Sequence, residues 1–167
     1  MCDTNKKNSQ HYYDLMVSTD DDHLSLDAFI NKRTVLGSRE QVAMILGLKD
    51  TEILSRFELG KTKLKNATYT LFLLLSDSHP KYQLQKKQKG VTPLLILPPT
   101  AGAERKQYRV NANKLKQDQM AMILGLTGKS LISRYEKGHK NPSVQTWTIF
   151  LLATNQHPFF KLSENIV

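Results

Sequence analysis

Residues 117–143 read QDQMAMILGLTGKSLISRYEKGHKNPS and form the most strongly patterned stretch of the chain. Residues 39–65 read REQVAMILGLKDTEILSRFELGKTKLK, and they align with it position by position, without a gap, when Arg39 is paired with Gln117. Both copies contain AMILGL, Ser-Arg-aromatic-Glu, a following glycine and a later His-Pro pair, and the register holds over residues 39–84 and 117–162. Chance does not produce such agreement. We therefore interpret the chain as a duplication of one helical unit.

Apolar residues recur at helical spacing on both sides of Gly125. The first set predicts a short helix that Gly125 ends by adopting the left-handed backbone conformation. The second set predicts another short helix, which ends at Gly138. The inward positions are Met120, Ala121, Ile123 and Leu124, then Leu131, Ile132 and Tyr135. Two short helices joined by a tight turn form a helix-turn-helix, whose second helix can lie in the major groove of DNA.

The second copy carries a recognisable set of motif residues. Gln117 stands four residues before Ala121, a Leu-Gly-Leu turn follows, and the run 132–136 reads ISRYE ahead of Gly138 and Pro142. This set resembles the lambda-repressor-like (Cro/Xre-type) helix-turn-helix family. The resemblance implies an all-helical fold and sequence-specific binding to double-stranded DNA. Members of this family usually bind as dimers on two-fold symmetric sites.

The resemblance covers roughly residues 29–77 and 107–155 and includes departures from the family pattern. The connection from Gly125 to the next helix is one residue longer than the family usually has. In the first copy, Arg39 replaces the leading glutamine and Leu64 replaces the proline. The first copy therefore resembles the family less closely than the second.

We expect an all-α protein with two tandem lambda-repressor-like helix-turn-helix units and short β-strands in the linker and after each last helix. Residues 1–23 are predicted to be an acidic flexible tail, and residues 24–84 to be unit one. Residues 85–106 form a basic, proline-flanked linker in this prediction, and residues 107–167 form unit two. The linker run VTPLLILPP predicts an extended segment or edge strand that packs against the strands after the last helices.

The outer helices can also be placed from the sequence. The first helix of each unit is predicted over residues 24–35 and 108–115, with residues 101–107 as a loop. The last helix of each unit is more apolar than one small core requires, and it ends at a His-Pro pair because proline restrains the residue before it. We expect its surplus leucines to form a helix-to-helix interface between copies or between subunits. These leucines are Leu73, Leu74, Leu151 and Leu152.

The chain carries a net charge of +9 that follows the repeats. Residues 1–28 carry −4, whereas residues 29–84, 85–106 and 107–162 carry +4, +4 and +6. One interpretation is that these lysines only keep the protein surface hydrated and soluble. Combined with a helix-turn-helix, the charge instead favours duplex DNA as the partner.

Candidate DNA contacts come from three kinds of position. Outward residues near the start of the second helix can lie at base edges, and lysines in the loop after it are expected to contact phosphates. The third kind of position is the helix-leading residue of the preceding helix, which belongs to the family pattern. The candidates are Arg39, Thr51, Glu52, Ser55, Arg56, Lys61 and Lys63 in the first copy, and Gln117, Lys129, Ser130, Ser133, Arg134 and Lys140 in the second.

Other classes of function find little support. Cys2 is the single cysteine, so an intrachain disulfide or a cysteine metal cluster is excluded, and no cofactor is expected. The run from Gly125 to Ser130 has two residues between its glycines where a phosphate-binding loop needs four. No set of residues in the repeats suggests catalysis, so we expect no enzyme activity. Without an apolar run of membrane-spanning length, the sequence predicts a soluble, cytoplasmic, nucleoid-associated protein.

The sequence therefore predicts a transcriptional regulator, by default a repressor, that reads an imperfect palindrome with its two units. It either acts as a built-in pseudo-dimer or forms a homodimer through the last helix of each unit. One rival is that unit two reads DNA while unit one serves dimerisation. Another is a protein-interaction role, as in a plasmid segregation or transfer accessory factor. The acidic tail either competes with DNA for the basic face or only aids solubility.

Overall fold

The computed structural model describes residues 11–21, 24–90 and 92–165. Within them the chain folds into eight α-helices and one two-stranded sheet, which confirms the expected all-α class with a short strand after each last helix. The elements are a 3-10 helix (Thr19–Asp21), α1 (Leu26–Leu36), α2 (Arg39–Ile45), α3 (Glu52–Glu58), α4 (Asn66–Leu75), β1 (Tyr82–Lys86), α5 (Gly102–Asn111), α6 (Gln117–Ile123), α7 (Ser130–Glu136), α8 (Val144–Ala153) and β2 (Phe160–Glu164).

The two halves of the chain follow the same order of elements. From the second helix onward, α6, α7, α8 and β2 begin and end at the positions that the sequence alignment pairs with the ends of α2, α3, α4 and β1. The first helices do not keep this register, because the connection from α5 to α6 is longer than that from α1 to α2. Asn113 and Lys114 in that connection both adopt positive φ angles of 56°, which turn the chain away from helical geometry.

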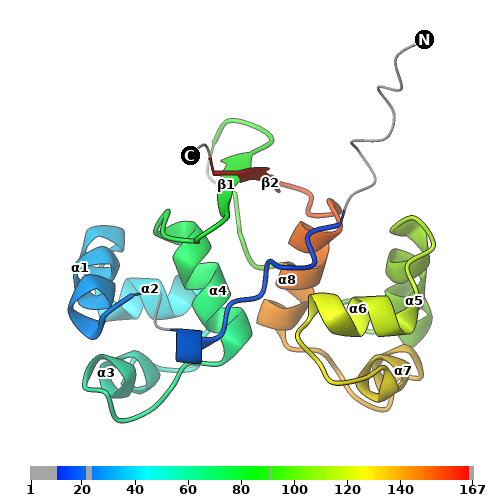
Figure 1. Ribbon diagram of the computed structural model, residues 1–167, viewed down its shortest axis with the longest axis horizontal. Coiled ribbons are helices and arrows are strands. Elements are labelled where there is room, and N and C mark those ends of the chain that lie inside the picture. The colour runs from blue at the N-terminus through cyan, green and yellow to red at the C-terminus, as the bar shows by residue number, and fades with distance from the viewer. Residues whose placement is uncertain (1–10, 22–23, 91, 166–167) are drawn as a thin grey trace.

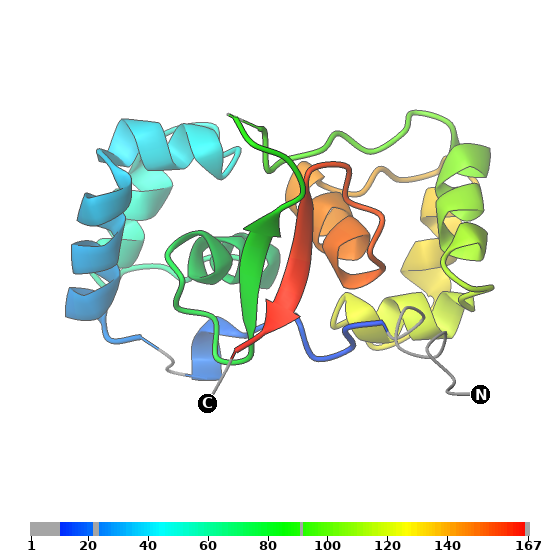
Figure 2. The ribbon, with the colours of Figure 1, turned by 90° about the horizontal axis from the view of Figure 1, so that it is seen from above.

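Helices α4 and α8 form the centre of the molecule. Figure 1 shows them between α1–α3 on one side and α5–α7 on the other, and Figure 2 shows the sheet lying across them. Strand β1 pairs antiparallel with β2. Helices α4 and α8 pack against each other and their four surplus leucines are all at most 3% exposed, so the predicted interface between copies is present within one chain. The faces predicted for a homodimer are therefore already buried.

Local signals in the sequence set the ends of the helices in each helix-turn-helix. Ser38 caps α2, since its Oγ atom accepts from the backbone N–H of Gln41 at 3.1 Å. Gly47 and Gly125 have φ angles of 68° and 67°, and the following leucine donates back to the carbonyl of Ala43 or Ala121. The predicted glycine turn between the two helices of each helix-turn-helix is thus confirmed in both halves.

The predicted position of the first helix of unit two is wrong. Residues 101–107 were expected to form a loop before a helix at 108–115, but α5 already begins at Gly102 and ends at Asn111. A Cβ atom on Gly102 would lie 2.2 Å from the backbone oxygen of Glu136. This glycine permits a close approach between α5 and the end of α7 instead of forming a turn.

The prediction of a flexible acidic tail is wrong for residues 11–17, which we call strap one. Leu15 and Val17 are buried beside α4, and the Val17 N–H donates to Thr70 Oγ1 at 2.8 Å. His79 Nε2 lies 2.8 Å from the Leu15 carbonyl oxygen. Burial of these two apolar side chains stabilises the packed position of strap one. Residues 1–10 and 22–23 of the predicted tail lie outside the described residues.

Residues 92–96 of the linker, which we call strap two, cross the other half of the molecule. Leu94 is buried, and its carbonyl oxygen lies 2.6 Å from His157 Nε2. The Ile96 N–H donates to Thr148 Oγ1 at 3.0 Å. The predicted packing of this linker run is confirmed, but strap two forms no strand, and these hydrogen bonds go to Thr148 of α8 and to His157 and not to the strands.

Candidate nucleic-acid interface

Helices α3 and α7 are the second helices of the two helix-turn-helix motifs, and we call them the recognition helices. Figure 1 shows both at the edge of the molecule that lies opposite the sheet. A contact from unit two fixes the turn that precedes α3. Gln145 Nε2, at the start of α8, donates to the carbonyl oxygens of Leu46 at 2.8 Å and Gly47 at 3.1 Å. The two motifs are therefore braced against each other.

Each recognition helix is anchored by an ion pair to the first helix of its unit. In unit one, Arg33 Nε lies 2.6 Å from Glu58 Oε1, and the side chains are 10% and 2% exposed. In unit two, Arg109 forms the same contact with Glu136. Burial alone raises the pKa of Glu58, but the hydrogen bonds from Arg33 and Arg39 outweigh it and hold the pKa below its ordinary value.

Sequence reasoning missed this anchoring role of the two glutamates. Both belong to the repeated Ser-Arg-aromatic-Glu motif, which was interpreted only as part of a recognition helix. A usable signal was present, because each unit also places an arginine on its first helix. Arg33 precedes Glu58 by 25 residues and Arg109 precedes Glu136 by 27.

The two candidates at the start of the preceding helices contact these same glutamates. Arg39 Nε lies 2.8 Å from Glu58 Oε2, and the Arg39 side chain is still 47% exposed. Gln117 Nε2 lies 2.5 Å from Glu136 Oε2. Both side chains therefore join the second helix of their unit to the recognition helix. Their contacts with DNA stay predictions.

The candidates on α3 differ in accessibility. Glu52 and Arg56 are exposed, and Thr51 and Ser55 are half-buried. Arg56 Nη1 lies 3.9 Å from Glu52 Oε1, one helical turn away, so the two charges partly offset each other. Thr51 directly precedes the helix and makes no capping hydrogen bond with its side chain.

The candidates on α7 present a more positive surface. Lys129, Ser130 and Arg134 are exposed, and Ser133 is half-buried. Within the described part of the chain, no carboxylate lies within ion-pair distance of Arg134. The outward face of α7 and the residue before it therefore carry two cations, Lys129 and Arg134, where the outward face of α3 carries the Glu52–Arg56 salt bridge.

The lysines predicted to contact phosphates are exposed, and they have neighbours that sequence reasoning missed. Lys61, Lys63 and Lys140 lie in the loops after the recognition helices, and Lys63 forms an ion pair with Asp20. A hollow of about 440 Å³ beside α3 is lined by four cations, among other residues. These cations are Lys49, Arg56, Lys63 and Lys65. Near α6, Lys116, Gln117 and Lys129 line a second hollow of about 530 Å³.

Arg105 holds the end of α7 in place. Its side chain is 3% exposed and donates to the carbonyl oxygens of Pro99 at 2.8 Å and Tyr135 at 2.9 Å, and to Asn141 Oδ1 at 2.7 Å. These bonds tie the linker and the loop after α7 to α5. The sequence analysis included Arg105 only in the net charge of the basic linker, and it did not predict that this side chain is buried and hydrogen-bonded.

Within residues 11–21, 24–90 and 92–165, no three side chains of His, Cys, Asp or Glu gather in a way that could hold a metal ion. None of the helices in this part of the chain has the length and apolar character required to cross a membrane.

Comparison with protein families gives one result, for unit two. Residues 106–158, roughly a third of the chain, match the family model described as helix-turn-helix, of the Cro/Xre type. The match runs from α5 through the end of α8 and contains the whole set of candidates on α7. It indicates a DNA-binding module in this half. Neither the curated proteins nor the solved structures contain a match to the chain.

Proposed function

We propose that this protein is a sequence-specific double-stranded DNA-binding transcriptional regulator, most simply a repressor that covers a promoter. The observation that carries the proposal is the exposure of both recognition helices at the edge opposite the sheet (Figure 1). Arg56 and Arg134 project from equivalent positions of these helices. Such a regulator works in the cytoplasm, associated with the nucleoid, and needs no cofactor.

The pairing of α4 with α8 supports a pseudo-dimeric mode of binding. Dimers of helix-turn-helix proteins place two recognition helices in successive major grooves, one helical turn apart or a multiple of it. In this chain the paired helices and the shared sheet hold both motifs within one molecule. One chain then reads a complete two-part site without a second copy. The site is an imperfect palindrome, because the two recognition helices differ at their starts.

The test is selection of bound sequences from random duplexes, followed by fluorescence anisotropy with the selected site. Neutralising about 6 to 10 phosphates should lower the affinity by about 10³ to 10⁵ between 50 and 200 mM salt. A selection that enriches two related half-sites supports the proposal. A flat salt response with no enriched sequence contradicts it and favours a protein-interaction role.

A second candidate function has unit two as the only reader of DNA. Two observations favour it: the helix-turn-helix family model matches residues 106–158 alone, and Arg56 faces Glu52 whereas Arg134 faces no carboxylate among the described residues. Scrambling each half of the selected site separately distinguishes the two candidates. Loss of affinity from both scrambled halves supports the pseudo-dimer, and loss from one half supports a single reader.

A further inference from the structure

The two straps occupy equivalent places in the two halves. Aligning Leu15 with Leu94 also aligns Val17 with Ile96. The hydrogen bonds agree with this pairing, since each leucine carbonyl contacts the buried histidine of its half and each following N–H contacts a threonine of the central helix. Strap one is thus the counterpart of strap two. Side chains at equivalent positions of the two straps can therefore be compared directly.

In strap one, Tyr12 fills a site between the halves. Its ring centre lies 4.9 Å from that of Tyr82 in an edge-to-face arrangement. Its hydroxyl donates to the Leu162 carbonyl oxygen at 3.3 Å, and its backbone N–H donates to the Ala153 carbonyl oxygen at 3.0 Å. Tyr12 therefore provides a phenol ring that covers β2 and the end of α8.

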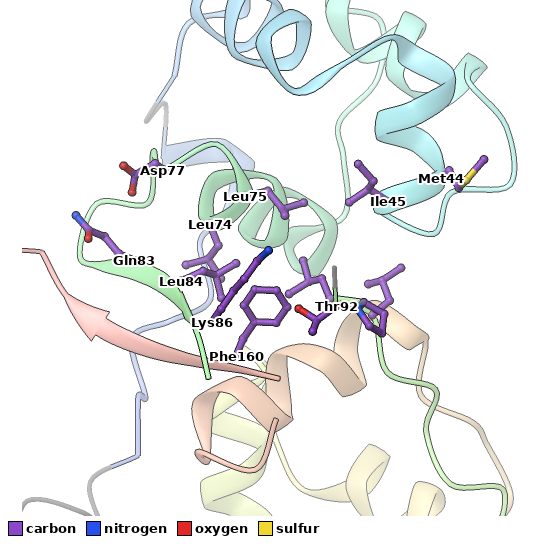
Figure 3. A pocket seen from close by; sticks show the side chains of 13 residues that line it. Met44, Ile45, Leu74, Leu75, Asp77, Gln83, Leu84, Lys86, Thr92 and Phe160 are labelled. Carbon is purple, nitrogen blue, oxygen red and sulfur yellow. The ribbon is translucent and has the colours of Figure 1, made fainter. Parts of the chain in front are cut away.

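The counterpart of this site is a cavity. The alignment of the two copies pairs Tyr82, Leu162 and Ala153 with Phe160, Leu84 and Leu75. These three counterparts all line one open cavity of about 700 Å³ (Figure 3). The residue paired with Tyr12 is Val91, which lies outside the described residues and has no aromatic ring. The neighbour of Tyr12 in strap one, Tyr13, is paired with Thr92, which also lines the cavity.

The walls of the cavity are mostly apolar. Residues of α2, α4, β1, strap two and β2 line it, and Figure 3 shows Leu75, Leu84, Thr92 and Phe160 gathered at its centre. Met44 and Ile45 come from the end of α2, and Leu74 and Leu75 from the end of α4. A volume of this size lies within the range of small-molecule sites, which is about 300 to 1,000 Å³. A bound molecule therefore contacts unit one and strap two at once.

Two polar groups in the cavity can form hydrogen bonds with the polar substituents of an aromatic molecule. The Oγ1 atom of Thr92 is buried and has no hydrogen-bond partner among the described residues. Such an atom is costly to leave unpaired. The second group is the Leu84 carbonyl. The Lys87 N–H donates to the Phe159 carbonyl and the Asn165 N–H donates to the Lys81 carbonyl, so these are hydrogen-bonded pairs of the ladder. Because such pairs alternate with non-hydrogen-bonded pairs, the carbonyls of the Leu84–Leu162 pair point away from the partner strand. The Leu162 carbonyl accepts from Tyr12, and Leu84 presents the equivalent acceptor.

We propose that this cavity binds a small aromatic molecule that carries a hydroxyl group. Its ring packs on Phe160 and Leu84 as Tyr12 packs in the other half. The hydroxyl donates to the Leu84 carbonyl, and Thr92 bonds to a second polar substituent. The site is separate from the recognition helices. The bound molecule braces α2 of unit one against strap two of the other half.

The experiment uses p-cresol, which is the tyrosine side chain as a free molecule, and the full chain labelled at leucine and isoleucine methyl groups. Addition of p-cresol should produce saturable shifts of the Leu75, Leu84 and Ile45 methyl resonances, with a dissociation constant on the order of 1 mM or below. Toluene, which has no hydroxyl, should bind at least several-fold more weakly. DNA is absent, so the result does not depend on the proposed regulatory function.

Two variants that fill the cavity provide the control, Leu75→Trp and Leu95→Trp. Each should abolish the p-cresol shifts. The variant used for the comparison is the one whose methyl resonances outside the cavity match those of the wild type, since its fold is unchanged. A second control creates the same site in the other half, because Tyr12→Ala vacates its ring position. This variant should bind a second equivalent of p-cresol there.

The outcomes separate clearly. Saturable shifts around Leu84 that disappear in the filled variant support the proposal. Absence of saturable shifts in the wild type overturns it, and binding of p-cresol to Tyr12→Ala then shows that the method detects such a site. Shifts that persist in the filled variant also overturn it, since the molecule is then bound elsewhere.

Discussion

The Nε2 atom of His157 lies 2.6 Å from the carbonyl oxygen of Leu94, so this buried ring fastens strap two to the turn before β2. The Nδ1 atom of the same ring accepts from the backbone N–H groups of Phe159 and Phe160, each at 3.1 Å. This arrangement requires a neutral imidazole with its proton on Nε2. Burial and the nearby charge of Lys87 lower the pKa of His157 below 6.5, although the bond to Leu94 opposes them.

We predict that His157 makes the stability depend on pH. Its pKa is lower in the folded than in the unfolded chain, so its contribution is full above about pH 6.5 and is lost as the pH falls through the folded pKa. His157→Gln should lower the free energy of unfolding by about 1 to 3 kcal/mol at pH 8 and flatten the decline towards pH 5. Denaturation curves across this range test both effects. His139→Gln, at an exposed histidine, should keep the wild-type slope. An equal slope in His157→Gln contradicts the prediction.

The buried pair of Arg33 and Glu58 gives a second prediction, about the anchoring of α3. Glu58→Ala leaves Arg33 buried without its carboxylate and should destabilise the protein by about 3 to 5 kcal/mol. The double variant Arg33→Met with Glu58→Leu should recover most of that loss, because two apolar side chains fill the same space. Urea denaturation of the single and double variants measures the difference. Glu52→Ala, at an exposed position of the same helix, should change the stability little. If Glu58→Ala behaves like Glu52→Ala, the pair does not anchor α3.

Features of the fold that depend on neighbouring residues could be predicted from the sequence. The turns at Gly47 and Gly125 are examples, since a left-handed residue after a short apolar stripe ends a helix whatever surrounds it. Features that depend on distant partners could not. Leu15 and Val17 are two apolar residues in a polar stretch, and only the distant α4 gives them a place to bury. The segment that contains Gly102 was predicted to be a loop, because Glu136, the backbone neighbour that this glycine accommodates, lies far along the chain.

The same distinction applies to the candidate interface. Helical periodicity alone placed Arg56 and Arg134 outward, and both are exposed. It could not show that Arg39 bends back to Glu58, because that contact joins two helices. Nor could it show that Asp20 lies beside Lys63, since 43 residues separate them.

The ion pair between Asp20 and Lys63 gives a third prediction, on competition with DNA. A carboxylate that occupies Lys63 competes with a phosphate for the same cation. Asp20→Asn should therefore raise the affinity for the selected site by a factor of about two to five, and more at low salt than at high salt. Fluorescence anisotropy at two salt concentrations measures it. Asp21→Asn removes the same charge at the neighbouring exposed position. If both variants raise the affinity equally, net charge and not this contact is responsible.

A fourth prediction concerns the equivalent arginines of the two recognition helices. Loss of a bidentate contact to a base costs about 1 to 3 kcal/mol, so Arg56→Ala and Arg134→Ala should each weaken binding measurably. Neither should shift the melting temperature much, because both side chains are exposed. Anisotropy measures the affinity, and a thermal melt controls for folding. An effect of Arg134→Ala alone identifies unit two as the only reader and ends the pseudo-dimer model.

The last prediction follows from the residues at the start of each recognition helix. Thr51 and Glu52 of α3 correspond to Lys129 and Ser130 of α7, whereas the serine and arginine further along are shared. Lysine favours the acceptors of guanine, and glutamate accepts from the amino group of cytosine. We therefore expect half-sites that share some bases and differ at others.

Replacing Thr51→Lys together with Glu52→Ser makes the helix starts alike and also frees Arg56 from the nearby carboxylate of Glu52. Selection from random duplexes should then return a more symmetric site, with the bases of the second half appearing in the first. The reverse exchange, Lys129→Thr with Ser130→Glu, should move the second half towards the first and serves as the matched control. Sites that keep their original asymmetry after both exchanges would show that these positions do not read bases.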